Sequence, residues 1–309
     1  MKSEKGKKIK NHVTTSVLLL CLACLCALPT SCVREDVDGC LQYSLSVKVV
    51  DTDGNDITSS GAVTSVDLYL FDADGFVRLI PKGTSTDYIF AEEESSDLTL
   101  VAWGNLKADS LEIPELAVGT SLEDAQIQLL QRLNGNDLPS TDLFYSRLEL
   151  SDSTIAATRG ISQTTATLVL QRLSASMSIL TYSFTDHFGE TQDGDTCRIV
   201  VRGAGNSINF LGKLTGGDAG YEPDIQESST GDLYAPSFRI FPTEEGGSLA
   251  IDIYRGDTLL FTTSTDDEGD ALQASAGNHL SVSIDFANAN AKIKVSVTNW
   301  EDIDQNTEM

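Results

Sequence analysis

Histidine is scarce in this chain, with three residues among 309. His12 lies in the first 31 residues, and we expect His187 and His279 to lie in two different domains. An isolated histidine is more often structural or solvated than catalytic, and neither of these two has a Ser or Cys partner at a recognisable nucleophile elbow. The sequence also lacks a Gly-rich phosphate loop and a Cys/His cluster with metal-ligand spacing. We therefore expect no enzymatic activity, no cofactor and no metal ion.

Basic residues are also few, with 21 Lys and Arg against 46 Asp and Glu and a formal net charge of −25. Five lysines and one glutamate lie in the first 31 residues, so the rest of the chain carries a net charge of about −29. Such a negative field disfavours nucleic acid and anionic membrane surfaces as partners. The acidic residues are spread through predicted loops, which indicates solubility on a crowded cell surface.

One acidic segment resembles a calcium-binding loop. Residues 51–56 read Asp-Thr-Asp-Gly-Asn-Asp. An EF-hand loop has Gly at its sixth position and Glu at its twelfth, whereas here Gly54 is fourth and Ala62 is twelfth. We therefore predict a plain hairpin turn. Adjacent carboxylates such as Asp266 and Asp267 are too common in so acidic a chain to indicate a glycosidase pair.

The apolar segment at residues 17–28 is too short to span a bilayer, which takes ~20 helical residues. Five lysines precede this segment, and Pro-Thr-Ser at 29–31 leads into Cys32. A basic end, a short apolar core and small residues before a cleavage site are typical of a secretory signal. A Cys directly after the small residues resembles a bacterial lipobox, in which that Cys is lipidated and becomes the new N-terminus. We predict a lipoprotein signal peptide at residues 1–31, lipidation of Cys32 and a tether at residues 32–40.

The lipobox pattern departs from the usual one at Pro29, where Leu or Val is the rule. Cys24 also follows a small residue, but cleavage there would leave apolar residues 25–28 on the mature chain. The alternatives to lipidation are simple secretion and an uncleaved segment. Lipidation would make the protein membrane-anchored rather than membrane-spanning. Acidic residues behind the Cys resemble the signal that sends some Bacteroidia-type lipoproteins to the outer face of the outer membrane: Glu35, Asp36 and Asp38.

Two cysteines remain in the mature chain besides the lipidated one. Cys40 and Cys197 form an even pair in an exported protein, where the compartment is oxidising, so a disulfide between them is one interpretation. Two separate buried thiols are the other.

The remaining pattern is that of β-strands. Residues 41–50 alternate apolar and polar side chains, which is the period of a half-buried strand. The clearest hairpin closes the chain, where residues 280–286 and 293–297 alternate on either side of an Ala/Asn turn. Many short strands with Gly, Asn and Asp turns favour β-sandwiches. The other expected strands are residues 63–72, 76–80, 98–103, 144–150, 165–173, 177–184, 196–202, 207–211, 237–241, 249–255 and 259–265.

One helix is expected at residues 121–133. Ser121 can cap it, with Asp124 three residues later, and Leu122, Ala125 and Leu129 recur at helical spacing. The length after the signal suggests two domains, each long enough for its own core. We place them at residues 41–173 and 174–309, because one apolar strand runs almost directly into the next at this boundary.

An ordered set of segments gives the chain a family resemblance. After the lipobox Cys come the strand at 41–50, Val-Asp-Leu-Tyr-Leu-Phe-Asp-Ala-Asp-Gly at 66–75 and Leu-Thr-Leu-Val-Ala-Trp-Gly-Asn at 98–105. Asp-Leu-Phe-Tyr at 142–145, Leu-Val-Leu-Gln-Arg-Leu at 168–173 and Ala-Gly-Asn-His-Leu at 276–280 follow, before a final strand to Trp300. In this order the segments resemble the fimbrial anchor subunits of Bacteroidia-type (type V) fimbriae, the fimbrillin-associated lipoproteins. The resemblance covers most of the mature chain.

The resemblance implies an all-β protein of two transthyretin-like β-sandwich domains in series, with the one expected helix in the first. It implies a structural role in anchoring or capping a fimbrial shaft at the outer membrane, with shaft subunits as partners. Shaft subunits of this system assemble by strand exchange after an Arg-directed protease removes their first strand, which is β-augmentation in physical terms. An anchor must keep that strand, since cleavage after Cys32 would separate protein from lipid. Arg34, the one Arg before the first strand, lies among acidic residues and is expected to be a poor protease site.

The final strand is the candidate for subunit contact. Its apolar residues Ile293, Val295 and Val297 alternate with Lys292, Lys294 and Ser296, and lysines are a common protection of an edge strand. Hairpin geometry favours pairing of this strand within its own domain, and contact with a neighbouring subunit is the alternative.

A glycan-binding surface lipoprotein is the second function considered. It would need an aromatic platform, for which Trp103 and Trp300 are the candidates. Trp103 ends an apolar strand and is expected in the core, whereas Trp300 could be exposed. The low aromatic content of 7% counts against this function.

Overall fold

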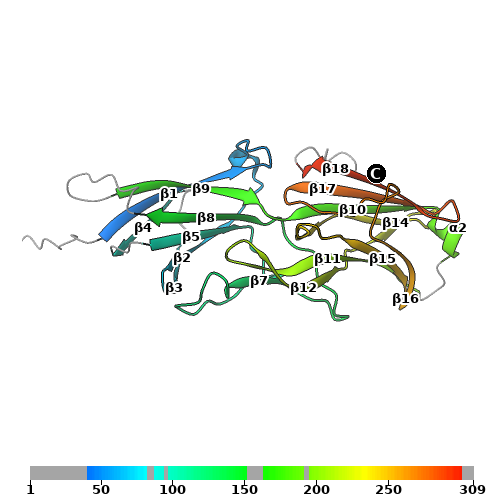
Figure 1. Cartoon of the computed structure of the whole chain (residues 1–309), viewed down its shortest axis with the longest axis horizontal. Helices are drawn as coiled ribbons and strands as arrows, with labels where there is room; N and C mark the ends of the chain where they lie inside the picture. The colour runs from blue at the N-terminus through cyan, green and yellow to red at the C-terminus, as the bar shows by residue number, and fades with distance from the viewer. Residues whose placement is uncertain (1–39, 82–86, 94–96, 152–162, 191–194, 301–309) are drawn as a thin grey trace, which may run out of the picture. The chain divides into compact units, whose positions relative to one another are not determined.

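The computed structural model describes residues 40–81, 87–93, 97–151, 163–190 and 195–300. The described chain is almost entirely β-structure, as expected (Figure 1). One seven-stranded sheet has the order β3-β2-β5-β8-β9-β1-β4. Its strands are β1 (Cys40–Val50), β2 (Val66–Asp72), β3 (Gly75–Ile80), β4 (Asp87–Glu93), β5 (Asp97–Gly104), β8 (Phe144–Ser151) and β9 (Gln163–Arg172).

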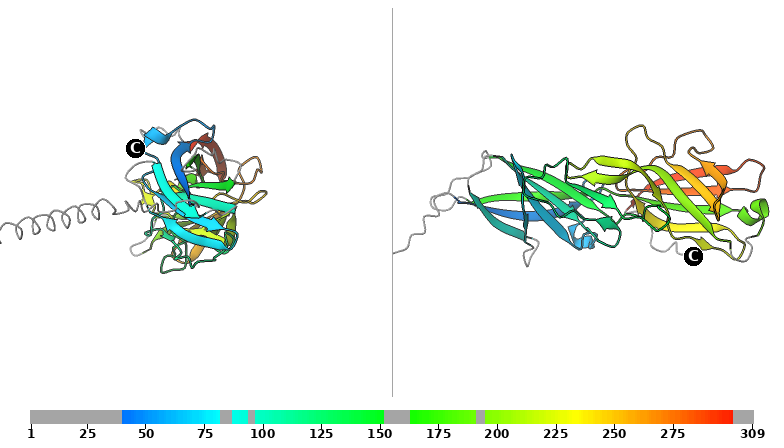
Figure 2. Two further views of the ribbon diagram at one scale, coloured as in Figure 1. Left: turned by 90° about the vertical axis from the view of Figure 1, so that its left-hand side faces the viewer. Right: turned by 90° about the horizontal axis from the view of Figure 1, so that it is seen from below.

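The seven-stranded sheet folds over at the contact between β8 and β9. These two strands pair at only two positions, Phe144 with Arg172 and Tyr145 with Gln171. Beyond them the sheet parts into two layers, β3-β2-β5-β8 and β9-β1-β4, as the right-hand view of Figure 2 shows. Alternating leucines of both layers fill one core, because the period-2 pattern of each strand turns them to the same side. They include Leu45, Leu68, Leu70, Leu100, Leu168 and Leu170.

Two further sheets share a second core. A five-stranded sheet has the order β13-β14-β10-β17-β18, and a six-stranded sheet has the order β16-β15-β11-β7-β6, with β12 also paired to β11. Met177, Ile179 and Val282 of the first sheet join Ile199, Val201 and Ile251 of the second in that core. The strands are β6 (Leu111–Glu112), β7 (Gln126–Leu129), β10 (Ala175–Tyr182), β11 (Cys197–Asn209), β12 (Leu214–Tyr221), β13 (Gln226–Glu227), β14 (Leu233–Ile240), β15 (Ala250–Arg255), β16 (Thr258–Thr263), β17 (Asn278–Asp285) and β18 (Lys292–Asn299).

The expected helix at residues 121–133 is wrong. Ser121 does receive a bond from the backbone N–H of Asp124, but one turn later the chain becomes strand β7 and pairs with β11. Ile127 and Leu129 are buried while Leu133 is fully exposed, so the buried side chains follow a period of two rather than 3.6. Pairing with β11 therefore outweighs local helix propensity. In the part of the chain that the structure describes, the α-helix is α2 (Phe184–Phe188), and η1 (Thr58–Ser60) is a single 3-10 turn.

The expected domain boundary falls where β9 ends at Arg172 and β10 begins at Ala175. Strands β6 and β7 precede that boundary in sequence yet belong to the six-stranded sheet formed mainly by later strands. The division into residues 41–173 and 174–309 stays a prediction. No helix within the described ranges has the length and apolar character needed to cross a membrane.

Candidate functional site

The final strand completes the hairpin that its sequence predicted. β18 runs antiparallel to β17, with Ile293 opposite Ile284, Val295 opposite Val282 and Val297 opposite Leu280. Ile293 and Val295 are partly buried against the second core, whereas 57% of Val297 is exposed. β18 is also the last strand of its sheet, so one of its two sides has no neighbouring strand in the sheet order.

The backbone of β18 shows which groups face that open side. The N–H of Ile293 donates to Oδ1 of Asp267 (2.7 Å), and its C=O accepts from the N–H of Asp267 (3.0 Å). Both polar groups of Ile293 therefore point away from β17. In an antiparallel ladder this orientation recurs at every second residue, so Val295 and Val297 present their N–H and C=O to the same side. No hydrogen bond from another described residue reaches these outward groups of Val295 and Val297.

Charge limits what can pair with this edge. Lys292 and Lys294 are exposed and alternate with the apolar residues, which discourages indiscriminate strand pairing. The turn containing Asp267 closes the edge at its beginning. The open backbone is therefore short and begins at Val295.

Strand β1, unlike β18, lies inside its sheet. It pairs in parallel with β9 over nine positions, from Gln42 opposite Gln163 to Val50 opposite Gln171, and β4 lies on its other side. Tyr43 is buried and stacks on Phe90 of β4, with ring centroids 5.0 Å apart. The strand expected at residues 41–50 is therefore present, and it lies between two neighbouring strands.

Neither tryptophan forms an exposed platform. Trp103 is fully buried, as expected, and packs on Tyr145 and Phe210. Trp300, the candidate that the sequence left open for exposure, is only 9% exposed and packs against two guanidinium groups, those of Arg172 (4.4 Å to the ring centroid) and Arg239 (4.8 Å). The two tryptophans of the sequence therefore do not provide the aromatic platform that a glycan-binding function needs.

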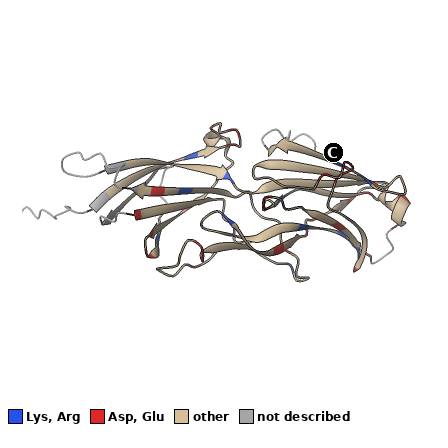
Figure 3. Cartoon of the chain, viewed as in Figure 1, with Lys and Arg blue, Asp and Glu red and all other residues tan. Residues whose placement is uncertain are grey.

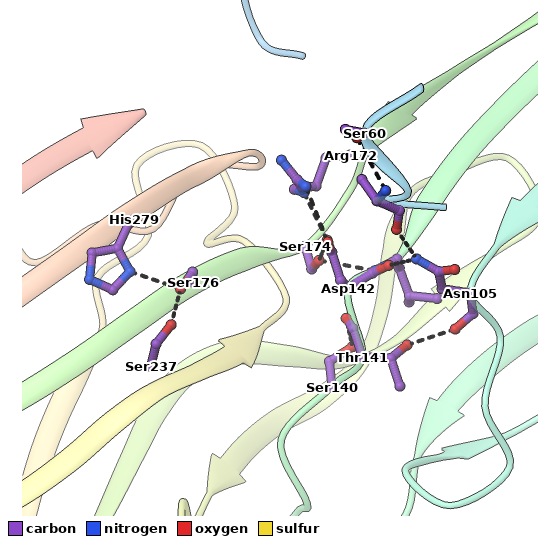
Figure 4. A network of polar contacts seen from close by, with 12 residues as sticks. Ser60, Asn105, Ser140, Thr141, Asp142, Arg172, Ser174, Ser176, Ser237 and His279 are labelled. Carbon is purple, nitrogen blue, oxygen red and sulfur yellow. Dashed lines mark hydrogen bonds and ion pairs between the residues drawn. The ribbon is translucent and has the colours of Figure 1, made fainter. Parts of the chain in front are cut away.

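A polar network surrounds Arg172 at the point where β9 ends (Figure 4). Its guanidinium donates to both carboxylate oxygens of Asp142, at 2.8 and 3.1 Å, in the bidentate geometry that makes such pairs strong. Ser174 Oγ accepts from the N–H of Leu143 and lies 3.5 Å from Asp142. Asn105, with a left-handed φ of 62°, donates to the carbonyl of Asp142. The network fastens the ends of β5, β8 and β9 to one another.

His187 and His279 occupy separate structural positions. Both ring nitrogens of His279 are hydrogen-bonded to serines, Nδ1 to Ser176 (2.8 Å) and Nε2 to Ser178 (3.0 Å). Burial, with a smaller effect of Arg239, lowers the pKa of His279. His187 bonds through Nδ1 to the carbonyl of Phe286. In the part of the chain described, no group of three or more His, Cys, Asp or Glu side chains is arranged to hold a metal ion.

The turn at residues 51–56 is held by its own hydrogen bonds. The carboxylate of Asp51 accepts from the backbone N–H groups of Asp53 and Asn55 and from the side chain of Asn55. Elsewhere, acidic residues are scattered over loops and strand ends instead of gathering on one element (Figure 3).

The predicted lipidation site Cys32 lies outside the described residues. Cys40 begins β1 and Cys197 begins β11, which belong to different sheets. The proposed disulfide between them stays a prediction, and labelling of thiols in the unfolded, unreduced chain would test it.

Sequence reasoning missed the importance of Arg172, Arg239 and Asp142. Arg172 and Asp142 occur in the segments that carry the family resemblance, but a single charged residue beside an apolar strand gives no periodic signal. Their partners lie far away along the chain, Asp142 being 30 residues from Arg172 and Arg239 stacking on Trp300, so only the tertiary structure shows the pairing.

Comparison with known proteins assigns the family. Residues 37–306 match the family of fimbrillin-A associated anchor proteins Mfa1 and Mfa2. The chain is 27% identical over 303 residues to the major fimbrium anchoring subunit FimB of Porphyromonas gingivalis strain W83, covering 95% of this chain and 97% of the relative.

Solved structures share the fold. The fimbrial anchor protein Mfa2 from Porphyromonas gingivalis superposes with a TM-score of 0.61 at 15% identity, over 84% of this chain and 98% of that one. A Bacteroides thetaiotaomicron structure described as a putative polysaccharide binding protein gives 0.59 at 16% identity, over 84% and 98%. These structural likenesses concern the fold alone, whereas the family match extends over most of the sequence. The chain therefore belongs to the family of fimbrillin-A associated anchor proteins.

Proposed function

We propose that this chain is a lipoprotein that holds a fimbrial shaft at the outer membrane, on the cell surface. Cys32 carries the lipid, and the open edge of β18 meets the neighbouring fimbrial subunit. The observation that carries the proposal is the interior position of β1, paired with β9 over nine residues and covered by β4 on its other side. A subunit that must stay joined to a lipid at its N-terminus needs a first strand that remains in the sheet.

The contact with the shaft is assigned to β-strand addition. Val295 and Val297 offer a short row of backbone donors and acceptors, and such an edge binds an extended segment through main-chain hydrogen bonds. The exposed Val297 supplies an apolar contact, and Lys292 and Lys294 favour a partner strand with acidic side chains. Ile293, Val295 and Val297 all lie opposite residues of their own β17, and Val295 and Val297 serve the partner through their other side, whereas that side of Ile293 is occupied by Asp267.

Replacement of Cys32 by Ala tests the lipid anchor. The variant should lose incorporation of labelled palmitate and either appear in soluble fractions or stall as an unprocessed precursor, because stable anchoring needs the acyl chains. Cys40→Ala is the matched control and should keep the label. Unchanged labelling and membrane retention of the Cys32→Ala protein would refute lipidation at this position.

Val297→Pro tests the edge. The N–H of Val297 points away from β17, so proline removes a donor from the open side and leaves the β17–β18 ladder in place. The protein should fold and reach the membrane, while fimbriae detach into the medium. Ser296→Pro is the matched control, because the N–H of Ser296 faces β17 and its loss should destabilise the protein itself. A folded Val297→Pro protein that retains fimbriae as the unsubstituted protein does would exclude this edge as the contact.

A further inference from the structure

The main chain passes between the seven-stranded sheet and the other two sheets at one end of the seven-stranded sheet. Gly104 at the end of β5 pairs with Phe144 at the start of β8, and Phe144 pairs with Arg172 at the end of β9. The chain leaves this row after Gly104 toward β6, returns at Phe144 from β7, and leaves again after Arg172 toward β10. Each of these three main-chain crossings therefore starts or ends at the row formed by these three residues, while β3 also contacts the segment between β6 and β7 through the backbone bonds of Phe76 with residues 119–120.

The N-terminal end of β1 lies at the other end of the same sheet. β1 and β9 are parallel, so Gln42 is opposite Gln163 at the start of β9, and Val50 is opposite Gln171 near its end. Tension between the N-terminus and the later sheets pulls β1 from its first residue and β9 from its last. The two strands are then drawn in opposite directions along their length.

In this geometry all hydrogen bonds between β1 and β9 resist the sliding of one strand past the other at the same time. The bonds of a parallel ladder are evenly spaced along the strands, so lengthwise sliding strains each of them at once. Pulling the same strand from the end next to the connections would instead break the bonds one after another. Side chains add resistance to sliding, since Ser46 Oγ is hydrogen-bonded to Thr167 Oγ1 across the pair (3.0 Å), and Leu45 lies in a core with Leu168.

The arrangement recurs in the next sheet along the path. β10 begins two residues after β9, and it pairs in parallel with β17 over seven positions, from Ser176 opposite His279 to Tyr182 opposite Asp285. A load that enters β10 at its start and leaves β17 at its end again shears the ladder. The proposed shaft contact lies elsewhere, because Val297 of the open β18 edge is opposite Leu280 near the start of β17, so a shaft bound there loads the β10–β17 ladder over only part of its length.

The link between the two ladders is reinforced. Arg172 holds Asp142, the backbone N–H of Leu173 donates to the carbonyl of Leu143, and the N–H of Gly277 donates to the carbonyl of Ser174. Trp300, at the end of β18, stacks on Arg172. The short connection at 173–174 is therefore not the sole mechanical link between β9 and the five-stranded sheet.

We infer that the parallel pair β1–β9 forms a shear ladder that makes this protein resistant to lengthwise pulling from its N-terminus. The inference rests on the proposed function, because a chain held by lipid at Cys32 and by a shaft at β18 is loaded along this path. The β1–β9 ladder is a property of the fold, so its resistance can be measured without lipid or shaft.

Single-molecule pulling of the full mature chain tests the inference. In a Cys40→Ala, Cys197→Ala background, a peptide tag replaces Cys32 as one handle, and Asn288→Cys in the exposed β17–β18 turn provides the other. The matched geometry keeps Asn288→Cys and moves the first handle to Ser59→Cys, an exposed position beyond the far end of β1. Thermal unfolding of the two proteins should coincide, which shows that the handles leave the fold intact.

The first rupture should need about twofold more force with the N-terminal handle than with the Ser59 handle, since hydrogen bonds that break together sum their resistance. Equal forces, or a lower force from the N-terminus, would overturn the inference. Such a failure would leave the anchoring proposal standing, because palmitate labelling and retention of fimbriae test that proposal independently.

Discussion

The indole ring of Trp300 stacks on the guanidinium of Arg172 at 4.4 Å. Arg172 ends β9 of the seven-stranded sheet, and Trp300 follows β18 of the five-stranded sheet. The same guanidinium lies 4.8 Å from the ring of Phe144 and is paired with Asp142, so its charge is compensated while its flat faces are covered by aromatic rings. A cation stacked on aromatic rings and shielded from water is more strongly bound than at an exposed site. The final strand is thus fastened at its end as well as along its length.

Loss of this ring should destabilise the protein. Trp300→Ala removes a large, nearly buried side chain and should lower the free energy of unfolding by about 3 kcal/mol. Trp300→Phe keeps a ring between the two arginines and should cost about 1 kcal/mol. Denaturant unfolding measures both, and an alanine variant as stable as the phenylalanine variant would show that the stacking contributes nothing.

The ion pair of Arg202 and Asp252 should matter through its buried member. The Asp252 side chain is 1% exposed and accepts bonds from Arg202 (2.6 and 3.1 Å) and Thr262 (2.7 Å), whereas the Arg202 side chain is half exposed. Asp252→Ala removes the buried acceptor of these charge-assisted bonds from Arg202 and Thr262 and should cost about 1–3 kcal/mol. Arg202→Ala opens the Asp252 carboxylate to water, and Thr262 still donates to it. Unfolding curves should therefore show a smaller loss of stability for Arg202→Ala than for Asp252→Ala, and a larger loss would mean that water does not reach Asp252.

The pKa of Asp252 gives this pair a pH dependence. Burial acts to raise that pKa, but the bonds from Arg202 and Thr262 outweigh it, and the pKa lies below its ordinary value of 3.8. The stabilisation is therefore present above pH 3.8 and is lost as the pH falls through the lower, folded-state pKa. Stability of the Asp252→Ala variant should change less with pH in this acidic range.

His279 should make the protein less stable in mild acid. Burial among β10, β14 and β17 lowers its pKa below the ordinary value of 6.5, with a smaller contribution from Arg239. Below pH 6.5 the imidazole is therefore protonated in the unfolded chain while it is still neutral in the folded chain. The free energy of unfolding is unaffected above pH 6.5 and declines as the pH falls below this value. His279→Gln should flatten unfolding midpoints over this range. An unchanged pH profile in the variant would contradict the assignment.

Truncation before Ala291 should prevent accumulation of the folded protein. The truncation removes β18, whose Ile293 and Val295 pack against the second core, and it also removes Trp300. The exposed β17 edge and the uncovered core should lead to proteolysis, which immunoblotting of whole cells would show. A stable, folded truncation would mean that β18 serves only a partner.

The hairpin of β17 and β18 was predictable because period-2 alternation on both sides of a polar turn leaves one register that buries both apolar faces. The segment around Ile127 was not, because its residues fit a helical stripe and a short strand equally well. The pairing of Ile127 with Ile208 of β11 decided between them. The burial of Trp300 was not predictable for a similar reason, since its neighbours Asn299 and Glu301 are polar and its arginine partners lie far away in sequence.

The sequence by itself determined the all-β class, most of the strand positions and the family, because alternation and turn residues are local properties of the chain. The prediction of lipidation at Cys32 likewise depends on a contiguous motif alone. Only the tertiary structure decided that β1 and β9 run parallel, that β18 keeps one open side and that Arg172 holds Asp142 and Trp300 together. Each of these depends on contacts between residues distant along the chain, and their free energy has no counterpart in any local pattern.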